Sequence, residues 1–275
     1  MGTLYLVATP IGNLADLTER ARAVLGEVDV VVAEDTRRTG KLLKHLAIKT
    51  RLLSVHGDSP AGRIAKVVEL LAESDVAYCT DAGTPGVSDP GAALVAAARA
   101  AGHAVSPVPG PSALAAALSV SGIETAGAVF LGFLPRRKAR RREALESAAA
   151  TGLPAVVYSS LRRAAAVAAE CVDVFGSAAP LLVCRELTKL YEEIVESTLG
   201  EAADLEVLTK ARGEYVLVIG PAALVAAKPT DDEVIAAVRE RLESGMSLRD
   251  VAAAVAAELK VPRRRAYQLG LQIDA

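Results

Sequence analysis

Aromatic residues are scarce in this sequence: it has no tryptophan, and aromatic side chains make up only 3% of its 275 residues. A core without large rings has to be built from aliphatic side chains, and 52% of the chain is hydrophobic. Short runs rich in Val and Leu are typical of buried strands, while the many Ala residues favour closely packed helices. The composition therefore predicts a well-buried globular protein.

Cysteine, histidine and long apolar runs are also scarce. The three cysteines (Cys79, Cys171 and Cys184) have no CxxC companion, and the three histidines share no metal-ligand spacing. This pattern favours reduced, buried thiols over a disulfide framework and predicts no metal site. The N-terminal stretch MGTLYLVATPIGN lacks the basic start of a signal peptide, and no stretch approaches the ~20 apolar residues that span a membrane. We therefore expect a soluble, cytoplasmic protein with no membrane association.

The chain has no excess of positive charge, because 31 Lys and Arg face 33 Asp and Glu. The simplest signature of a nucleic-acid-binding protein is therefore absent. Locally, however, PRRKARRREAL carries six positive residues between positions 136 and 142, and PRRRAYQ carries three more. A solvated helix start is the ordinary explanation of such a run, but in a chain of net charge −2 a phosphate-contacting surface explains it better. The predicted RNA-binding residues are Arg136, Arg137, Lys138, Arg140, Arg141, Arg142, Arg263, Arg264 and Arg265.

Short apolar runs alternate with helical patterns through the first half of the chain, which is typical of a mainly parallel sheet covered by helices. The expected strands span residues 3–8, 28–33, 51–55, 76–80 and 104–108. The helical patterns span residues 17–26, 38–47, 62–73 and 92–102. This alternation predicts an α/β domain over residues 1–120.

A second series of strand-like runs follows, and it predicts a second α/β domain over residues 121–226. Its expected strands span residues 128–133, 155–160, 180–186, 193–198 and 214–220. The link between the third and fourth of these is short, so part of this sheet should be antiparallel. Residues 230–275 have a helical pattern with a turn before PRRRAYQ, which predicts a small helical, helix-turn-helix-like tail.

The stretch DAGTPGVSDPG, residues 81–91, follows an expected buried strand and suits neither helix nor strand. Ligands of parallel α/β sheets bind beyond the carboxyl ends of the strands, where glycine lets the backbone approach a ligand closely. The alternative is a tight turn that caps the next helix. Residues 8–18 and 107–119 supply similar loops at the same sheet edge, which favours a shared ligand cleft. The spacing matches neither the dinucleotide fingerprint nor the P-loop.

Charged residues follow two other expected strands. Glu34, Asp35 and Arg37 come after the second strand, and Arg185, Glu186 and Lys189 lie at and just beyond the end of the strand expected over residues 180–186. Acidic residues at a helix N-terminus also cap the helix, and charge clusters often form a solvated face, so both interpretations stay open.

Several longer motifs, in order from Leu4 to about Gly220, resemble the small-subunit ribosomal RNA methyltransferases of the tetrapyrrole-methylase superfamily. They are LYLVATPIGNLADLT, VVAEDTRRTGKLL, DAGTPGVSDPG, VPGPSALAAALSVSG, FLGFLPRR, RELTKLYEE and GEYVLVIG. The resemblance implies two α/β domains that bind S-adenosylmethionine between them. It further implies 2′-O-methylation of a cytidine in the decoding centre of small-subunit rRNA, and a homodimer.

The resemblance also implies which residues bind the cofactor. In members that act on tetrapyrroles the loop reads GDPxxFGRG, whereas here Thr84 replaces the Asp, and Asp89 and Pro90 replace the Gly-Arg pair, which argues against a tetrapyrrole substrate. The implied set comprises residues of the strand-end loops, small residues at the start of the helix after Pro111, and second-domain residues near the adenosine. It consists of Pro10, Asp81, Gly83, Thr84, Val87, Ser88, Ser112, Ala113, Tyr158, Ser159, Gly213 and Glu214.

For such a reaction, a ribose hydroxyl needs its proton removed or polarised, and positioning supplies much of the acceleration. The candidate bases are Glu34, Asp35, Glu186 and Lys189, with Arg37 and Arg185 expected to bind the RNA backbone. Two alternatives stay open: a methyltransferase of the same fold for a tetrapyrrole or another small molecule, and a non-catalytic RNA-binding ribosome-assembly factor.

Overall fold

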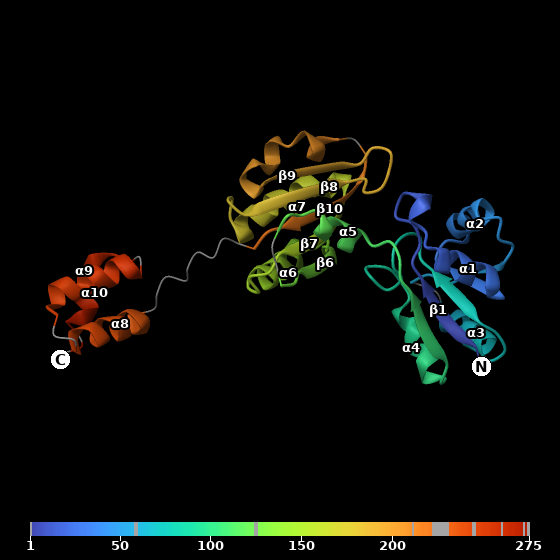
Figure 1. The fold of residues 1–275 in the computed structure, drawn as a ribbon, viewed down its shortest axis with the longest axis horizontal. Helices are drawn as coiled ribbons and strands as arrows, with labels where there is room; N and C mark the ends of the chain where they lie inside the picture. The colour runs from blue at the N-terminus through green and yellow to red at the C-terminus, as the bar shows by residue number, and fades with distance from the viewer. Residues whose placement is uncertain are drawn as a thin grey trace. The chain divides into compact units, whose positions relative to one another are not determined.

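A computed structural model describes residues 2–57, 60–123, 126–210, 212–221, 231–243, 246–259, 261–271 and 273. Contacts within the chain group it into two units, residues 1–222 and residues 223–275 (Figure 1). Each unit is described by itself.

The larger unit begins with a fully parallel five-stranded sheet in the order β3-β2-β4-β1-β5. Its strands are β1 (Thr3–Val7), β2 (Val30–Ala33), β3 (Arg51–Ser54), β4 (Val76–Cys79) and β5 (Ala104–Val108). All five expected strands are confirmed, with ends shifted by two residues at most. The central strands β2 and β4 are buried along their whole length, as expected of a parallel sheet covered on both faces.

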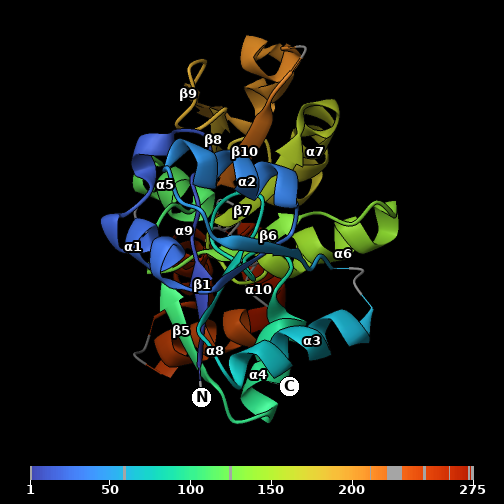
Figure 2. The ribbon, with the colours of Figure 1, turned by 90° about the vertical axis from the view of Figure 1, so that its right-hand side faces the viewer.

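Two pairs of helices cover this sheet. Helices α1 (Glu19–Glu27) and α2 (Thr36–His45) pack on the face that carries Val7, Val31 and Cys79. Helices α3 (Ala61–Leu71) and α4 (Ala92–Ala100) lie together on the other face (Figure 2). A short 3-10 helix, η1 (Leu14–Asp16), follows β1.

The second sheet has the order β6-β7-β10-β8-β9 and mixes strand directions. Its strands are β6 (Val129–Phe133), β7 (Ala155–Ser160), β8 (Pro180–Arg185), β9 (Glu193–Thr198) and β10 (Glu214–Ile219). Only the β6–β7 pair is parallel, and β10 runs antiparallel to both β7 and β8. The prediction of a partly antiparallel second sheet is confirmed.

The two faces of the second sheet are covered differently. Helices α6 (Lys138–Ala149) and α7 (Leu161–Phe175), with the 3-10 helices η2 (Leu199–Asp204) and η3 (Glu206–Thr209), cover the face that includes Val157, Val183 and Leu217. The other face packs against α5 (Ala113–Ser119), which follows the last strand of the first sheet. The helix α5 therefore brings the strand-end loop after β5 against the second sheet.

The smaller unit contains α8 (Asp231–Glu243), α9 (Leu248–Glu258) and α10 (Arg263–Gly270), packed around Val234, Val238, Val251, Val255 and Leu269. The predicted helical tail is thus present. The division at residues 120 and 226 stays a prediction, because residues 1–222 form one contact unit and residues 222–230 lie outside the described part. Across the described residues, no helix combines the length and hydrophobicity needed to cross a membrane.

Candidate functional site

Three strand-end loops meet at the carboxyl edge of the first sheet. Thr9, after β1, and Gly83, after β4, exchange two backbone hydrogen bonds of 2.9 Å. The Thr84 hydroxyl donates to the carbonyl oxygen of Pro111, after β5, at 3.1 Å. The loops that the sequence placed at one edge are therefore tied together directly.

The loop of residues 81–91 needs its glycines. Gly83 has φ +75°, a left-handed conformation that a side chain would strain, and Gly91 has φ +140°. A Cβ on Gly91 would also lie 3.1 Å from Cε1 of Tyr78. The backbone conformation therefore requires glycine at both positions, and at Gly91 the close approach of Tyr78 requires it as well.

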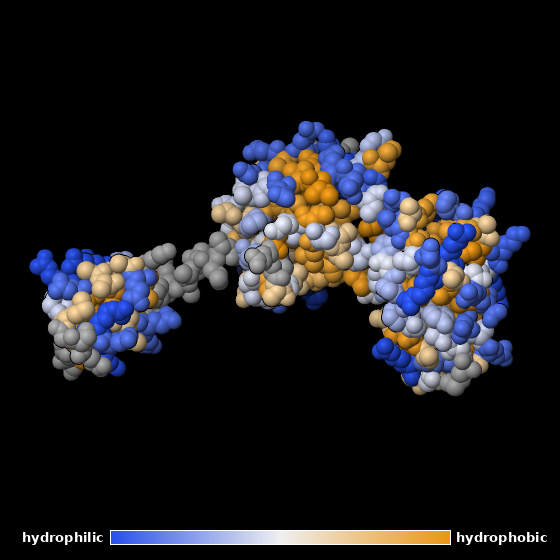
Figure 3. All heavy atoms as spheres, viewed as in Figure 1, coloured by the Kyte–Doolittle hydropathy of each residue, from blue (hydrophilic) through white to orange (hydrophobic). Residues whose placement is uncertain are grey.

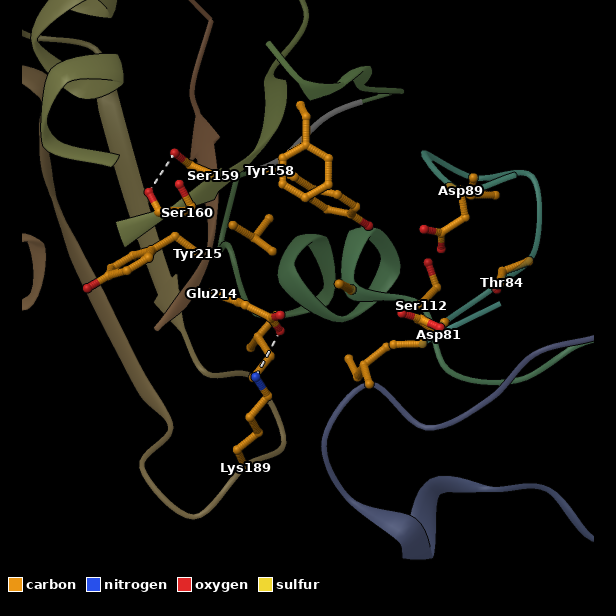
Figure 4. Close-up of a pocket in the computed structure, with 18 of the residues that line it drawn as sticks. Asp81, Thr84, Asp89, Ser112, Tyr158, Ser159, Ser160, Lys189, Glu214 and Tyr215 are labelled. Carbon is orange, nitrogen blue, oxygen red and sulfur yellow. Dashed lines mark hydrogen bonds and ion pairs between the residues drawn. The ribbon is translucent and has the colours of Figure 1, made fainter. Parts of the chain in front are cut away.

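A cavity of about 380 Å³ lies between this loop cluster and the second sheet (Figure 4). One wall comes from the first sheet's loops and the start of α5, and the other from β7, β10 and the loop after β8. The lining residues are Ile11, Arg38, Asp81, Ala82, Gly83, Thr84, Val87, Asp89, Ser112, Ala113, Phe133, Tyr158, Ser159, Ser160, Leu187, Lys189, Glu214, Tyr215 and Val216.

Most residues of the predicted cofactor set line this cavity. They are Asp81, Gly83, Thr84, Val87, Ser112, Ala113, Tyr158, Ser159 and Glu214. The other three lie beside it. Pro10 lines a smaller neighbouring cavity. Ser88 lies against Gly132 of β6: a Cβ on Gly132 would be only 2.0 Å from the Ser88 Oγ atom. Gly213 adjoins the side chain of Arg185.

An aromatic wall bounds the cavity on the side of the second sheet. The Tyr158 ring packs edge-on against Phe130 at 4.9 Å and against Phe133 at 5.7 Å. Phe133 is 61% exposed although it is a large apolar side chain. Sequence reasoning missed Phe133, yet its place at the end of β6, in FLGFLPRR, is the signal that could have found it. An exposed aromatic wall of this kind suits a planar, apolar ligand group.

Two carboxylates line the cavity on the side of the first sheet. The Asp81 Oδ2 atom lies 3.4 Å from Nε of Arg38, while its Oδ1 atom is buried and has no hydrogen-bond partner among the described residues. Burial and the nearby carboxylates of Glu34 and Asp81 raise the pKa of Asp89 to about 6. Burial also raises the pKa of Glu34, which accepts a hydrogen bond from the Asp81 N–H at 3.3 Å. In the part of the chain that the structure describes, no three His, Cys, Asp or Glu residues are placed to hold a metal ion.

Lys189 is the one residue of the six catalytic candidates that lines the cavity. Its Nζ lies 2.8 Å from Oε2 of Glu214 and 3.0 Å from Oε1 of Glu186. Burial alone would lower the pKa of Lys189, but these two carboxylates raise it. For Glu186, the hydrogen bonds from the Glu214 N–H and from Lys189 outweigh burial and lower its pKa. Lys189 is therefore held in its charged form.

The loop between β8 and β9 continues from Lys189 into two exposed hydrophobic side chains. Leu190 is 87% exposed and Tyr191 is 70% exposed, and hydrophobic atoms stand out on this loop in Figure 3. A Cβ on Gly12 would lie 2.4 Å from Cγ of Lys189, so the loop after β1 passes close to the start of this segment.

The remaining catalytic candidates lie outside the cavity. Asp35 caps α2 and pairs with Arg37 at 2.7 Å, and this hydrogen bonding lowers the pKa of Asp35 to about 2. Arg185 donates two hydrogen bonds to the carbonyl oxygen of Arg212 and pairs with Glu193. Its side chain is only 12% exposed, so this arginine serves the local fold.

A smaller cavity of about 200 Å³ adjoins the first and shares Arg38 and Asp81 with it. Its lining includes Thr9, Thr39, Thr80 and Lys41. Arg38 thus stands at the junction of two cavities, a position that the sequence did not distinguish from that of Arg37.

The basic residues of the predicted RNA surface fall into two groups. Arg141 binds Glu170 and the carbonyl oxygens of Pro135 and Arg136, and Arg142 pairs with Glu146. In the tail, Arg265 pairs with Asp231 and Arg263 donates to the Arg249 carbonyl oxygen. The exposed side chains of Arg136, Arg137, Lys138 and Arg140 make no ion pair with any described residue, and neither does Arg264.

This architecture, two α/β sheets with a glycine-rich cavity lined from both, is that of a tetrapyrrole methylase. The family model of the Tetrapyrrole (Corrin/Porphyrin) Methylases matches residues 3–203. The fold is similar to a cobalt-precorrin-4 methyltransferase of cobalamin biosynthesis, with TM-score 0.62 and 19% identity over 79% of this chain and 94% of that one. It is also similar to the uroporphyrin-III-C-methyltransferase of Thermus thermophilus, with TM-score 0.55 and 23% identity over 82% and 97%.

Closer relatives match the whole length, including the helical tail. The ribosomal RNA small subunit methyltransferase I of Synechocystis is 40% identical over 100% of this chain and 99% of its own length. The protein of the same name from Xylella fastidiosa is 42% identical over 97% and 98%. The chain therefore belongs to the ribosomal RNA small subunit methyltransferase I family, within the tetrapyrrole methylases.

Proposed function

We propose that this protein transfers a methyl group from S-adenosylmethionine to the ribose 2′-oxygen of a cytidine in the decoding centre of small-subunit rRNA. The observation that carries the proposal is the similarity over the full length, tail included, to proteins named as small-subunit rRNA methyltransferases. Its partner is then the small ribosomal subunit or its rRNA, and it acts in the cytoplasm as a homodimer.

The cavity fits S-adenosylmethionine in chemistry. The aromatic wall of Tyr158 and Phe133 suits an adenine ring, and the buried Asp81 Oδ1 atom is an acceptor that needs a donor. We assign the methionine part to Gly83, Thr84 and Val87 with the start of α5 at Ser112 and Ala113. The adenosine part falls to Tyr158, Ser159 and Glu214. When bound, the cofactor supplies an electrophilic methyl group on a sulfonium sulfur.

The chain's own residues then have to position the ribose hydroxyl and accept its proton. Lys189 is a poor base because its pKa is raised, and Asp35 is a poor one because its pKa is about 2. Glu186 already accepts hydrogen bonds from Lys189 and from the Glu214 N–H. Glu34, whose pKa burial raises, is the remaining candidate for the proton acceptor; it lies outside the cavity lining, one hydrogen bond from the lining residue Asp81.

We expect RNA to bind the exposed Lys and Arg side chains rather than those already held by ion pairs or hydrogen bonds within the protein. Arg37 is 86% exposed and stays a candidate for the RNA backbone, whereas Arg185 is committed to the Arg212 carbonyl. The run Arg136–Lys138 and Arg140 offers further free positive charge. A tetrapyrrole substrate has less support, because the solved tetrapyrrole enzymes share 19 and 23% identity with this chain and show the fold alone.

The test is methyl transfer from labelled S-adenosylmethionine to small ribosomal subunits that lack this modification, with the product nucleotide mapped. A single 2′-O-methylcytidine is the expected product. Cofactor binding without transfer to the subunit would favour a small-molecule substrate. Loss of both would favour a non-catalytic assembly factor.

A further inference from the structure

The cavity carries negative charge that the protein itself leaves uncompensated. Asp81 forms one ion pair, with Arg38 at 3.4 Å, and Arg37 acts on it only over a longer distance; one of its oxygens has no hydrogen-bond partner among the described residues. Lys189, the other cation in the lining, is already bound by two carboxylates. Asp89 makes no ion pair with a described residue.

Asp89 faces into this cavity from the end of the loop after β4. In Figure 4 its carboxylate points toward Ser112 and Asp81, and the Tyr158 ring extends toward it from the opposite wall. The side chain is half-buried, with Glu34 and Asp81 as its carboxylate neighbours. Burial of a carboxylate without a cation is unfavourable, so a positive ligand group would be favoured here.

We propose that Asp89, together with Asp81, binds positive charge on the cofactor and makes the cavity prefer S-adenosylmethionine over its product, S-adenosylhomocysteine. The two molecules share the ammonium and carboxylate groups, but only the substrate carries a positive sulfonium sulfur. The inference rests on the proposed cofactor and deepens it, because it assigns discrimination between cofactor and product to one side chain. Weaker retention of the product would assist turnover.

Proton linkage gives this role a measurable signature. The pKa of Asp89 in the free protein is about 6, so a bound cation that lowers it must release a proton at pH 6. Below the pKa that Asp89 has in the free protein, the ligand competes with a proton for this carboxylate. The affinity for the ligand therefore rises with pH and levels off above that pKa. For a pKa of about 6, the affinity should rise about tenfold between pH 5 and pH 7.

The groups that act on Asp89 come from several elements. Thr80 is hydrogen-bonded to Asp89, which lowers the pKa of that carboxyl, and His56 acts electrostatically on the neighbouring Glu34. Glu34 and Asp81 are acidic and hold the pKa of Asp89 up, and the pKa values of Tyr78 and Tyr158 are raised by burial, which keeps both neutral. The cations of the lining are Arg38 and Lys189, and the two carboxylates beside Lys189 raise its pKa. Glu34→Gln should therefore lower the pKa of Asp89 and move the rise in affinity to lower pH.

The experiment is calorimetric titration with S-adenosylmethionine and, separately, S-adenosylhomocysteine at pH 5 to 8, in two buffers of different ionisation enthalpy. The wild-type protein should release a proton near pH 6 with the first ligand and less with the second. At pH 7, Asp89→Asn should weaken S-adenosylmethionine about tenfold or more and the product by a clearly smaller factor. Asp173→Asn, the same change on the exposed side of α7, is the matched control and should leave both affinities unchanged.

The outcomes separate the inference from the function on which it rests. If neither ligand binds the wild-type protein, the proposed cofactor is wrong. If both bind, but Asp89→Asn weakens them equally or the pH dependence survives in that variant, then the cofactor stands and the role of Asp89 is refuted. Thermal melts of each variant establish that it is folded. Asp89→Asn should itself raise the melting temperature at pH 7, because it removes the repulsion among Asp89, Glu34 and Asp81.

Discussion

Replacing Arg136, Arg137, Lys138 and Arg140 together with Ala tests whether the unpaired cations near α6 contact RNA phosphates. These four side chains are exposed and make no ion pair with a described residue; only Lys138 acts on a nearby carboxylate, that of Glu170, which Arg141 already binds. Removing them should leave the fold intact, because none of them forms a structural contact like that of Arg141 with Glu170.

The size of the effect follows from counterion release. Each phosphate neutralised on a single strand contributes about 0.7 to the slope of log affinity against log salt, so four contacts correspond to a slope of about 3. If the wild-type protein and the variant have the same RNA affinity when extrapolated to 1 M salt, the variant should bind RNA about 10³-fold more weakly than the wild type at 0.1 M salt. Fewer contacts would reduce both figures in proportion.

The assay is a salt titration of the anisotropy of a fluorescently labelled fragment of small-subunit rRNA. The matched control loses the same charge elsewhere, by Ala substitution of the exposed residues Arg22, Lys49, Lys66 and Arg99, and should keep the wild-type slope within one unit. If the first variant keeps the wild-type slope, or if both variants lose it equally, the surface around α6 does not bind RNA. Arg141→Ala should instead lower the melting temperature, because Glu170 and two carbonyl oxygens lose their partner.

Three further substitutions test the cavity and its supports. Gly83→Ala should cost about 1 kcal/mol of stability and weaken cofactor binding in calorimetry, whereas Gly86→Ala, equally strained at φ +83° but outside the cavity, should cost the same and spare binding. Tyr215→Phe removes a buried hydrogen bond of 2.8 Å to the Val207 carbonyl oxygen and should lower the free energy of unfolding by about 1 kcal/mol in urea titrations. If Tyr215→Phe were as stable as the control Tyr191→Phe, which changes an exposed side chain, this expectation would be wrong. Lys189→Met leaves the Glu186 and Glu214 carboxylates without the cation between them. The melting temperature should therefore fall more at pH 8 than at pH 4. An equal fall at the two pH values would show that Lys189 does not neutralise these carboxylates.

Much of the fold followed from local pattern. The runs of β2 and β4 are buried on both faces, so their continuous apolar sequences identified them without ambiguity. The short link between β8 and β9 was enough to predict antiparallel pairing. The contact of α5 with the second sheet was beyond such reasoning, because its alanines carry no information about which sheet they will meet.

The parts of the site formed by glycine-rich loops could be predicted from sequence, whereas the parts that depend on which side chains pair with each other could not. Glycine and small residues in the loop of residues 81–91 predicted a ligand cleft from their composition and their place at a strand end, and the family resemblance added Ser112. The roles of charged residues could not be predicted from sequence. Arg185 was expected to bind the RNA backbone but donates to the Arg212 carbonyl oxygen, and Arg38 rather than Arg37 lines the cavity. Asp89 was visible only as a departure from a motif, since its raised pKa comes from burial and then from Glu34, 55 positions away in sequence.

The three cysteines have a practical consequence. Cys79, Cys171 and Cys184 are buried, and burial raises the pKa of each thiol to about 12, so almost none is thiolate at neutral pH. The native chain is thus nearly inert to maleimide dyes without any cysteine being removed. A single cysteine introduced in place of Arg137 would become the reactive position, and a fluorophore attached there would test directly whether RNA reaches this surface.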